Sequence, residues 1–273
     1  RGGEEGTIRK NLIDHNNIDA IIGLPANIFF GTGIPTIIMV LRKNKKDSDV
    51  LIIDASKGFE KDGKNNKLRA CDIKRIVDAY KERPEKIKKF ARRVSRAEII
   101  QNDYNLNIPR YVDSSEKAES WDIYASMFGG IPEAELQDLS AYWTAFPHLK
   151  AALFSPDNEA YCHLNVQNLK NAVLNHPDVV AFKTAFQNAF GDFDAYLKSA
   201  LIDGITQLNA AGEEERLSRE IFARLAGIPL VDRYAAYQLL DDDWKKIAID
   251  LEIIQTEGFA ATKQVDPNMV LKK

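Results

Sequence analysis

The sequence predicts an α/β region followed by an all-α region, and two features of the chain favour this division. Three nearly continuous apolar runs lie close together between residues 18 and 53. From about residue 114 onward, apolar residues recur only at the spacings typical of helices. We therefore expect a sheet-containing domain at residues 1–113 and a helical domain at residues 114–273.

The three apolar runs predict strands of one buried sheet. They are residues 18–24 (IDAIIGL), 36–41 (TIIMVL) and 50–53 (VLII). None of them alternates between apolar and polar residues, which is typical of strands covered on both faces. Only residues 42–49 (RKNKKDSD) separate the second run from the third, and this is too short for a parallel crossover. We therefore expect the last two strands to form an antiparallel hairpin.

The loop between the first two runs is unusually apolar and is the first candidate site. Residues 25–35 (PANIFFGTGIP) contain Phe29 and Phe30 beside a Gly-Thr-Gly segment. Two interpretations stay open: the backbone closely approaches a flat or apolar ligand, or the rings simply pack over the end of the sheet. Gly-Thr-Gly alone is weak evidence for a dinucleotide site, because a third glycine and a following helix are missing.

Two helices and a connector are expected around this sheet. Thr7 can cap a first helix, which has its apolar residues on one face. After the strands, residues 56–69 are polar and rich in turn formers, and they predict a connector without periodic structure. Asp72 can cap a second helix that stops before Pro84. The apolar positions of that helix are Ile73, Ile76, Val77 and Tyr80.

A basic run and an asparagine-rich stretch follow the second helix. The run predicts an amphipathic helix that contacts phosphates, or else a solvated surface or a contact to an acidic segment. Its cations are Lys86, Lys88, Lys89, Arg92, Arg93 and Arg96. In residues 102–111, Asn105 and Arg110 can bond bases or phosphates, or can merely stabilise their own turn.

The second half of the chain predicts helices. A helix starts at Pro132 and continues to Pro147, and another starts at Pro177 with a stripe of phenylalanines that favours a core. A third opens at the acidic residues 213–215, a favourable end for negative charge. The last helix is expected to be interrupted by the aspartates at residues 241–243, which are expected to be solvated.

Charge and composition restrict the partners of the chain. Residues 1–113 hold 23 Lys and Arg against 16 Asp and Glu, whereas the remainder holds 14 against 24. This asymmetry suggests that a polyanion binds the first half, although two ordinary surfaces of different charge explain it as well. The two cysteines predict no disulfide framework, which fits a reducing cytoplasm. No membrane span and no metal-ligand spacing is found, so we expect no membrane contact and no metal.

The first 113 residues resemble the modification subunit of type I restriction-modification systems, an adenine-specific DNA methyltransferase. The match runs in family order through short segments of this half. These are residues 6–13 (GTIRKNLI), 18–25 (IDAIIGLP), 29–35 (FFGTGIP), 40–44 (VLRKN), 53–56 (IDAS) and 102–111 (NDYNLNIPRY).

The resemblance implies a Rossmann-like sheet that binds S-adenosylmethionine, with this chain supplying its C-terminal strands. Such enzymes methylate the exocyclic amino group of an adenine that is flipped out of DNA. The glycine-rich cofactor loop and the Asn-Pro-Pro-aromatic catalytic motif are absent from the chain. We therefore expect a fragment that starts after the catalytic motif, with no catalytic residue of its own, no cofactor bound and no activity alone. It can supply the wall of the base pocket, for which the candidates are Phe29, Phe30, Gly31, Thr32, Gly33 and Pro35.

The resemblance also implies an assembly. In this family, two copies of the modification subunit bind a separate specificity subunit, and a restriction subunit that is both motor and nuclease can join them. The acidic helical region is the candidate for that docking. The alternative is a non-enzymatic DNA-binding or scaffolding module whose sheet is vestigial.

Overall fold

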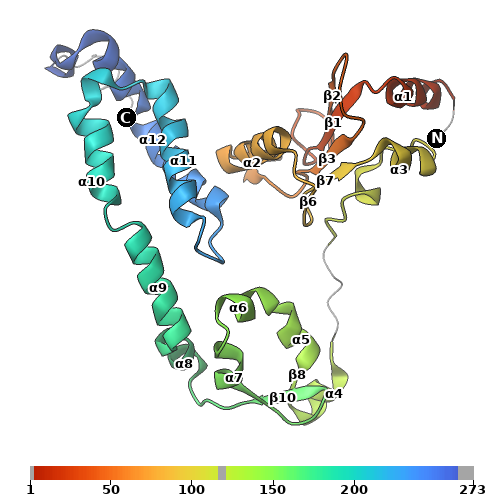
Figure 1. Ribbon diagram of the computed structural model, residues 1–273, viewed down its shortest axis with the longest axis vertical. Helices are drawn as coiled ribbons and strands as arrows, with labels where there is room; N and C mark the ends of the chain where they lie inside the picture. Colours follow the sequence, from red (N-terminus) through yellow and green to blue (C-terminus); the bar gives the residue numbers. More distant parts are fainter. Residues whose placement is uncertain (1–2, 116–120, 264–273) are drawn as a thin grey trace. The chain divides into compact units, whose positions relative to one another are not determined.

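The computed structural model describes residues 3–115 and 121–263 and divides the chain into two compact units, Arg1–Ala118 and Glu119–Lys273 (Figure 1). Within the described residues, no helix is long and apolar enough to cross a membrane.

The first unit contains a five-stranded mixed sheet with the strand order β2-β1-β3-β7-β6. Strands β1 and β3 run parallel, and the other neighbouring pairs are antiparallel. A separate two-stranded sheet pairs β4 with β5. The elements of this unit are α1 (Glu4–Asp14), β1 (Ile18–Gly23), β2 (Ile37–Leu41), β3 (Val50–Asp54), β4 (Glu60–Asp62), β5 (Asn65–Lys67), α2 (Ala70–Glu82), β6 (Lys86–Ile87), β7 (Ala91–Val94), α3 (Arg96–Gln101) and η1 (Ile108–Arg110).

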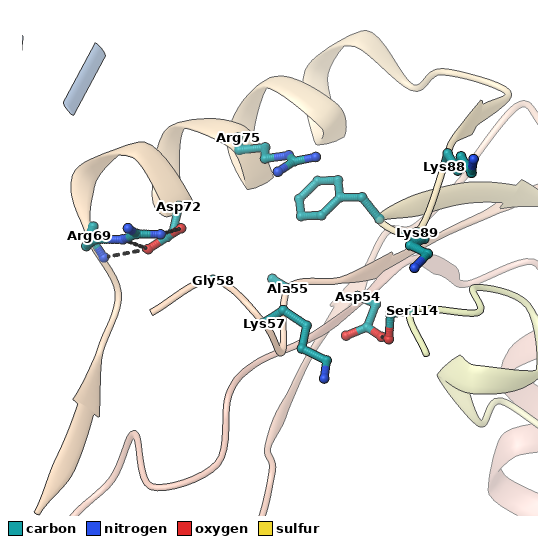
Figure 2. A pocket seen from close by; sticks show the side chains of 11 residues that line it. Asp54, Ala55, Lys57, Gly58, Arg69, Asp72, Arg75, Lys88, Lys89 and Ser114 are labelled. Atoms are coloured by element: carbon teal, nitrogen blue, oxygen red, sulfur yellow. Dashed lines mark hydrogen bonds and ion pairs between the residues drawn. The ribbon is translucent and has the colours of Figure 1, made fainter. Parts of the chain in front are cut away.

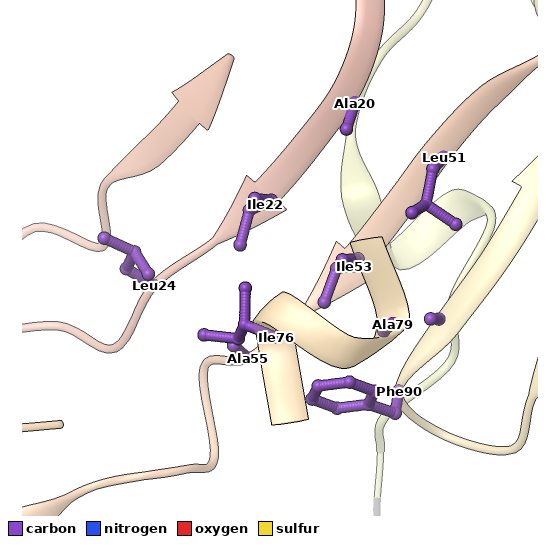
Figure 3. Close-up of a cluster of buried hydrophobic side chains, with 10 residues drawn as sticks. Ala20, Ile22, Leu24, Leu51, Ile53, Ala55, Ile76, Ala79 and Phe90 are labelled. Atoms are coloured by element: carbon purple, nitrogen blue, oxygen red, sulfur yellow. The ribbon is translucent and has the colours of Figure 1, made fainter. Parts of the chain in front are cut away.

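Both faces of the two central strands are covered, as the apolar runs predict. Every residue of β1 and β3 is buried. On one face, Ile22 and Ile53 pack against Ile76 and Ala79 of α2 (Figure 3). On the other face, a second core joins the sheet to α1, α3 and the segment that follows η1. The first unit is therefore a layered α/β structure.

The predicted hairpin of the second and third runs is wrong. Strand β2 pairs with β1, in antiparallel register, and β1 separates it from β3. Residues 42–49 pass the end of β1, where Arg42 N donates to Asn17 O at 2.9 Å and Lys45 Nζ donates to Ile18 O at 3.0 Å. Crossing one intervening strand requires only roughly 10 Å, which a linker of this length spans easily.

Strand β2 also departs from the prediction that all three runs are covered on both faces. It lies at the edge of the sheet, and Ile37, Ile38 and Leu41 are exposed. An uninterrupted apolar run shows that a strand is suited to burial, but it does not determine which strand of a sheet receives the covering helices. Within the described residues, β2 presents an apolar edge.

Three local predictions in this unit need correction. Helix α1 begins at Glu4 rather than after Thr7, whose hydroxyl donates to Gly3 O within the first turn. Residues 56–69 contain the β4–β5 hairpin, which the polar composition of the connector hides. Helix α2 begins two residues before Asp72, and it ends at Glu82 as predicted. Asp72 still caps it, because its carboxylate accepts a bond from Arg69 N at 3.0 Å.

The basic run does not form the predicted amphipathic helix, and only its last cation, Arg96, lies in a helix, at the start of α3. The rest of the run forms the antiparallel strands β6 and β7 with a tight turn at Lys88 and Lys89, and β7 pairs with β3. Pairing of β7 with a strand some forty residues earlier overrides the helical spacing of the run, because strands are selected by their neighbours as much as by local sequence.

A buried ionic network lies at the start of β1, at the edge of the sheet opposite the carboxyl ends of β1 and β3. The side chain of Asp19 is fully buried, and Tyr80 Oη donates to its Oδ2 at 2.6 Å. Arg83 Nη1 lies 3.1 Å from Asp19 Oδ1, and Arg42 Nη2 lies 3.2 Å from Oδ2. The network therefore connects β1 with the end of α2 and with the linker that leads to β3.

The second unit is mostly helical, but it also contains a three-stranded sheet, so the prediction of helices only is wrong. The sheet has the order β8-β10-β9. The elements are α4 (Ile123–Phe128), β8 (Ile131–Pro132), α5 (Glu133–Asp138), α6 (Ser140–Ala145), α7 (Leu149–Leu153), β9 (Phe154–Pro156), β10 (Tyr161–Leu164), α8 (Leu169–Asn175), α9 (Pro177–Ala189), α10 (Phe193–Lys198), η2 (Ser199–Asp203), η3 (Ile205–Gln207), α11 (Ala210–Leu225), α12 (Arg233–Glu257) and η4 (Phe259–Lys263).

Helix boundaries in this unit follow the predictions in part, with three exceptions. Helix α9 begins at Pro177 as predicted, whereas α11 begins at Ala210, three residues before the predicted acidic start. The helix expected from Pro132 to Pro147 is split at Leu139 into α5 and α6. Helix α12 continues through the three aspartates without interruption. Asp241 is buried and pairs with Lys245 one turn later, so it is not solvated as predicted.

Candidate functional site

A pocket of about 600 Å³ opens where the parallel strands β1 and β3 end, and we call it the strand-end pocket. Ligands of open α/β sheets bind outside the carboxyl ends of the strands, which makes this the expected place for a site. Its lining comes from β1, β2, α1, the residues after β3 and the segment before η1. The lining residues are Arg9, Gly23, Leu24, Pro35, Thr36, Ile37, Met39, Asp54, Ser56, Asn105, Leu106, Asn107, Ile108 and Pro109.

Close backbone packing shapes the floor of the strand-end pocket. Gly23 is the last residue of β1, and a Cβ atom at this position would lie 2.6 Å from Ile108 Cδ1. The absence of a side chain at Gly23 leaves the space that the end of the Ile108 side chain occupies. The segment before η1 thereby becomes one wall of the pocket.

Asp54 forms the boundary between the strand-end pocket and a second pocket, because it lines both. It is the last residue of β3 and is buried. Ser56 N donates to Asp54 Oδ1 at 3.0 Å, and Ser114 Oγ donates to Oδ2 at 2.5 Å. The carboxylate therefore holds the loop after β3 and the end of the first unit together.

The strand-end pocket combines apolar walls with a few polar groups, a composition typical of sites for small aromatic ligands. Thr36 Oγ1 is buried and forms no hydrogen bond within the part of the chain that the structure describes. Asn105 Oδ1 accepts a bond from Asn107 N at 2.9 Å. The Thr36 hydroxyl is thus left able to bond a ligand.

The second pocket, about 440 Å³, lies beside the first turn of α2, and we call it the basic pocket (Figure 2). Figure 2 shows α2 with Arg69, Asp72 and Arg75 on one side, and the loop after β3 with Lys57 on the other. Its lining residues are Asp54, Ala55, Lys57, Gly58, Arg69, Asp72, Arg75, Lys88, Lys89, Phe90 and Ser114. Asp72 hydrogen-bonds the Arg69 side chain and raises the pKa of that guanidinium.

The predicted base-pocket residues are only partly brought together. Pro35 lines the strand-end pocket, but Phe29, Phe30 and the Gly-Thr-Gly segment at residues 31–33 do not. Phe29 is 54% exposed and Phe30 is 91% exposed, so the interpretation that both rings pack over the sheet end is wrong for Phe30. The Phe30 side chain is apolar, but it is exposed because it lies in an exposed loop.

The basic run separates into two groups of cations. The arginines have acidic partners: both Nη atoms of Arg92 bond the Glu98 carboxylate at 2.8 Å, Arg93 Nη2 bonds Glu85 at 2.7 Å, and Arg96 lies 3.5 Å from Asp14. The lysines are exposed, and Lys88 and Lys89 line the basic pocket whereas Lys86 does not.

The asparagine-rich stretch at residues 102–111 stabilises its own turns, as one interpretation of the sequence predicts. Asn102 Nδ2 donates to Glu98 O at 3.0 Å, and Arg110 Nη1 donates to Asn102 Oδ1 at 3.0 Å. Tyr111 Oη donates to Asn105 O at 2.5 Å. Asn105 also lines the strand-end pocket, whereas Arg110 does not.

The residues of the two pockets that were missed by reasoning from the sequence include Thr36, Asp54, Lys57 and Arg75. Asp54 had a usable signal, because a polar residue directly after a buried strand lies at the edge where ligands bind. Thr36 and Lys57 lie in loops whose course the sequence does not reveal, and Arg75 lies on α2. Among the described residues, no group of three His, Cys, Asp or Glu side chains is arranged to hold a metal ion.

Comparison with known proteins agrees with the resemblance seen in the sequence. The family model described as N-6 DNA methylase matches residues 1–120. This part of the chain, which we call the methylase segment, is therefore similar to the N-6 DNA methylase family. This methylase segment contains every residue of the strand-end pocket and of the basic pocket.

The relatives of the methylase segment are type I restriction enzyme methylase subunits, as the short segments predict. The MpnII methylase subunit of Mycoplasma pneumoniae is 42% identical over 124 residues, which cover 45% of this chain and 23% of that subunit. The MjaVII methylase subunit of Methanocaldococcus jannaschii is 42% identical over 129 residues, covering 45% and 22%. The aligned part of this chain thus spans less than a quarter of the length of either subunit.

The chain is also similar to part of one solved structure. The methyltransferase subunit of a type I restriction-modification system from Streptococcus thermophilus is 54% identical and covers 42% of this chain and 24% of its own, with a TM-score of 0.41.

Proposed function

We propose that this chain is part of a type I restriction-modification subunit that transfers a methyl group from S-adenosylmethionine to the exocyclic amino group of adenine in DNA. The observation that carries the proposal is the family match over residues 1–120, the segment that builds both pockets. Residues 1–113 then form the C-terminal part of a Rossmann-like methyltransferase domain.

The strand-end pocket is proposed to receive part of the flipped adenine. Chemistry on a base requires its extrusion from the duplex, followed by stacking on apolar side chains and hydrogen bonding to its edge. Leu24, Pro35 and Met39 offer apolar surface, and the Thr36 hydroxyl has no partner within the described residues. The exposed rings of Phe29 and Phe30 are the stacking candidates, because a ring that meets a ligand outside the fold must be accessible.

The cofactor is assigned to parts of the subunit other than this chain. S-adenosylmethionine, when bound, supplies the methyl group. Its binding in this family depends on a glycine-rich loop, and its reaction depends on an Asn-Pro-Pro-aromatic motif; the chain has neither. The role of the described residues is to shape the base pocket, and we expect the chain alone to be inactive.

We propose that residues 114–273, which include the second unit, bind other subunits in the cytoplasm. The proposed partners are the specificity subunit, a second modification subunit and the restriction subunit. Four large apolar side chains on or next to α4, Trp121, Ile123, Met127 and Phe128, are at least 70% exposed. Clusters of exposed apolar side chains mark interaction surfaces.

Methylation by the complete subunit tests the proposal. Transfer of labelled methyl groups to DNA should fall in a Thr36→Val variant and should be retained in Thr36→Ser, which keeps the hydroxyl. Because Thr36 Oγ1 has no partner in the described part of the fold, both variants should unfold at the same urea concentration as the wild type. A complete subunit that binds DNA but transfers no methyl group would instead favour the non-enzymatic DNA-binding or scaffolding module.

A further inference from the structure

The basic pocket carries an excess of positive charge that the fold does not neutralise. Five cationic side chains, Lys57, Arg69, Arg75, Lys88 and Lys89, line it together with only two carboxylates. Both carboxylates already accept hydrogen bonds, Asp72 from Arg69 at 2.8 and 3.0 Å, and Asp54 from Ser56 and Ser114. Neither is left to balance the remaining cations.

Three of these cations are available to a ligand. Within the described residues, Lys57, Lys88 and Lys89 form no hydrogen bond and no ion pair. The pKa of Asp113 is lowered mainly by hydrogen bonds from Ser115 and, less, by the charge of Lys89. Arg75 lies differently, with its guanidinium carbon 4.3 Å from the centre of the Phe90 ring. The three lysines come from two separate segments, the loop after β3 and the β6–β7 turn, so the fold gathers them around one cavity.

The turn that presents Lys88 and Lys89 is held in a fixed and unusual conformation. Lys89 has a φ of 59°, in the left-handed region that side chains other than glycine rarely adopt. Phe90 N donates to Ile87 O at 3.1 Å, and Asp54 N donates to Phe90 O at 2.7 Å. The turn is therefore tied to the end of β3, on the side of the pocket where Asp54 and Ser114 lie (Figure 2).

We propose that the basic pocket is a phosphate-binding site, with Lys57, Lys88 and Lys89 as the binding residues. Lysine binds phosphate as a compact point charge, and three lysines from two segments can surround a group with several equivalent oxygens. The phosphate can come from the backbone of DNA or from a small molecule. The DNA source rests on the proposed function, whereas the small-molecule source does not.

The first experiment measures the binding of the 273-residue chain to a short DNA duplex by fluorescence anisotropy at several salt concentrations. If the pocket binds a backbone phosphate, Lys57→Gln and Lys88→Gln should each reduce the slope of log K against log salt by about 0.9. Lys64→Gln and Lys86→Gln are matched controls, because they remove one charge from the same connector and the same hairpin outside the pocket. The controls should keep the wild-type slope.

The second experiment replaces DNA with inorganic phosphate and pyrophosphate in isothermal titration calorimetry on the same chain. If the pocket takes a small phosphate, either anion should bind, and Lys57→Gln or Lys88→Gln should weaken binding roughly tenfold, the loss of one charge-assisted hydrogen bond. If the pocket variants weaken phosphate binding in calorimetry but leave the salt dependence of DNA binding unchanged, the site binds a small ligand. If the pocket variants match their controls in both arms, the proposal is overturned.

The left-handed turn supplies a variant that should fold at least as well as the wild type. Lys89→Gly removes the charge while it relieves the strained backbone, so the chain should become slightly more resistant to urea as phosphate or DNA binding weakens. Equal binding by this variant and the wild type would contradict a role for Lys89. None of these measurements involves methyl transfer, so the proposed enzyme activity and the phosphate site can fail separately.

Discussion

The Tyr80 hydroxyl donates a hydrogen bond of 2.6 Å to the buried carboxylate of Asp19, across 61 positions of the chain. Asp19 lies in the first strand of the sheet, and Tyr80 lies in the last turn of α2. Burial of an unpaired charge costs far more free energy than burial of an unpaired neutral group. The position of the end of α2 is therefore constrained, because the partners of the Asp19 carboxylate must lie within hydrogen-bonding distance of it. The contact fixes the helix on the sheet and thereby the position of the basic pocket at its other end.

Removal of this hydroxyl should destabilise the first unit. We expect Tyr80→Phe to lower the free energy of unfolding by about 1.5 to 3 kcal/mol, the range for a hydrogen bond to a charged group. Urea unfolding of the chain measures it. Lys81→Gln, on the exposed side of the same turn, is the control and should stay within about 0.5 kcal/mol of the wild type. Equal midpoints for the two variants would contradict the role of the contact.

The same pair predicts a dependence on alkaline pH. The hydrogen bond to Asp19, together with burial, raises the pKa of Tyr80. Below the unfolded value of about 10, the phenol is neutral in both states and its contribution to stability is complete. As the pH rises above that value, only the unfolded state releases the proton, so the contribution is lost. The difference in urea midpoint between wild type and Tyr80→Phe should therefore stay constant up to about pH 10 and shrink at higher pH, whereas a difference that stays constant above pH 10 would argue against the shift.

Gly23 and Ile108 should behave as a coupled pair. Gly23→Ala places a Cβ atom 2.6 Å from Ile108 Cδ1. Because that atom is the end of a flexible side chain, the cost should be about 1 kcal/mol, at the low end for overpacking. Ile108→Val removes the clashing methyl group, so the double variant should cost less than the sum of the two single variants. Strict additivity in urea unfolding would show that the two residues do not meet.

Phe30 should matter for activity and not for stability. Its ring is 91% exposed, so Phe30→Ala should change the free energy of unfolding by no more than about 0.5 kcal/mol. If the ring stacks on the flipped base, the complete subunit should lose roughly 1 to 3 kcal/mol of base binding. Methyl transfer and thermal unfolding of Phe29→Ala and Phe30→Ala, compared side by side, separate the two effects. Full activity in both variants would remove the loop from the site.

The arginines of the basic run should contribute little to DNA binding. Arg92 and Arg93 each bond a carboxylate, so a phosphate would have to displace Glu98 or Glu85. We expect Arg92→Gln and Arg93→Gln to leave the salt dependence of DNA binding unchanged, unlike the pocket lysines. A slope reduced by about 0.9 in either arginine variant would show that the ion pairs open on DNA.

The sequence predicts the central strands well because their information is local. Continuous apolar residues in β1 and β3 are sufficient to bury both faces, and Pro84 is sufficient to place the end of α2. The order of the strands depends on contacts between residues far apart in the sequence, since one neighbour of β3 is β7, paired through Ile53 and Ala91. No pattern within the basic run distinguishes a helix from a hairpin whose partner strand lies some forty residues earlier.

The candidate sites, too, can be predicted where the information is local and not where it depends on the fold. The loop with Phe29 and Phe30 can be singled out from its composition, and the lysines can be singled out from their charge. The grouping of Lys57 with Lys88 and Lys89 requires the fold, because two loops far apart in sequence meet only after β7 has joined β3. The grouping of Thr36, whose hydroxyl has no partner among the described residues, with residues 105–109 around the strand-end pocket likewise requires the fold.

The core that joins α1 to the sheet has a consequence for synthesis of the protein. It contains Ile13 near the start of the first unit and Tyr111 and Val112 near its end. A chain that emerges from the ribosome one residue at a time cannot close this core until residue 112 is free, although β1 and β2 are complete some seventy residues earlier. During that interval the strands offer unpaired edges, so the first unit should depend on rapid translation or on a chaperone more than its final stability suggests.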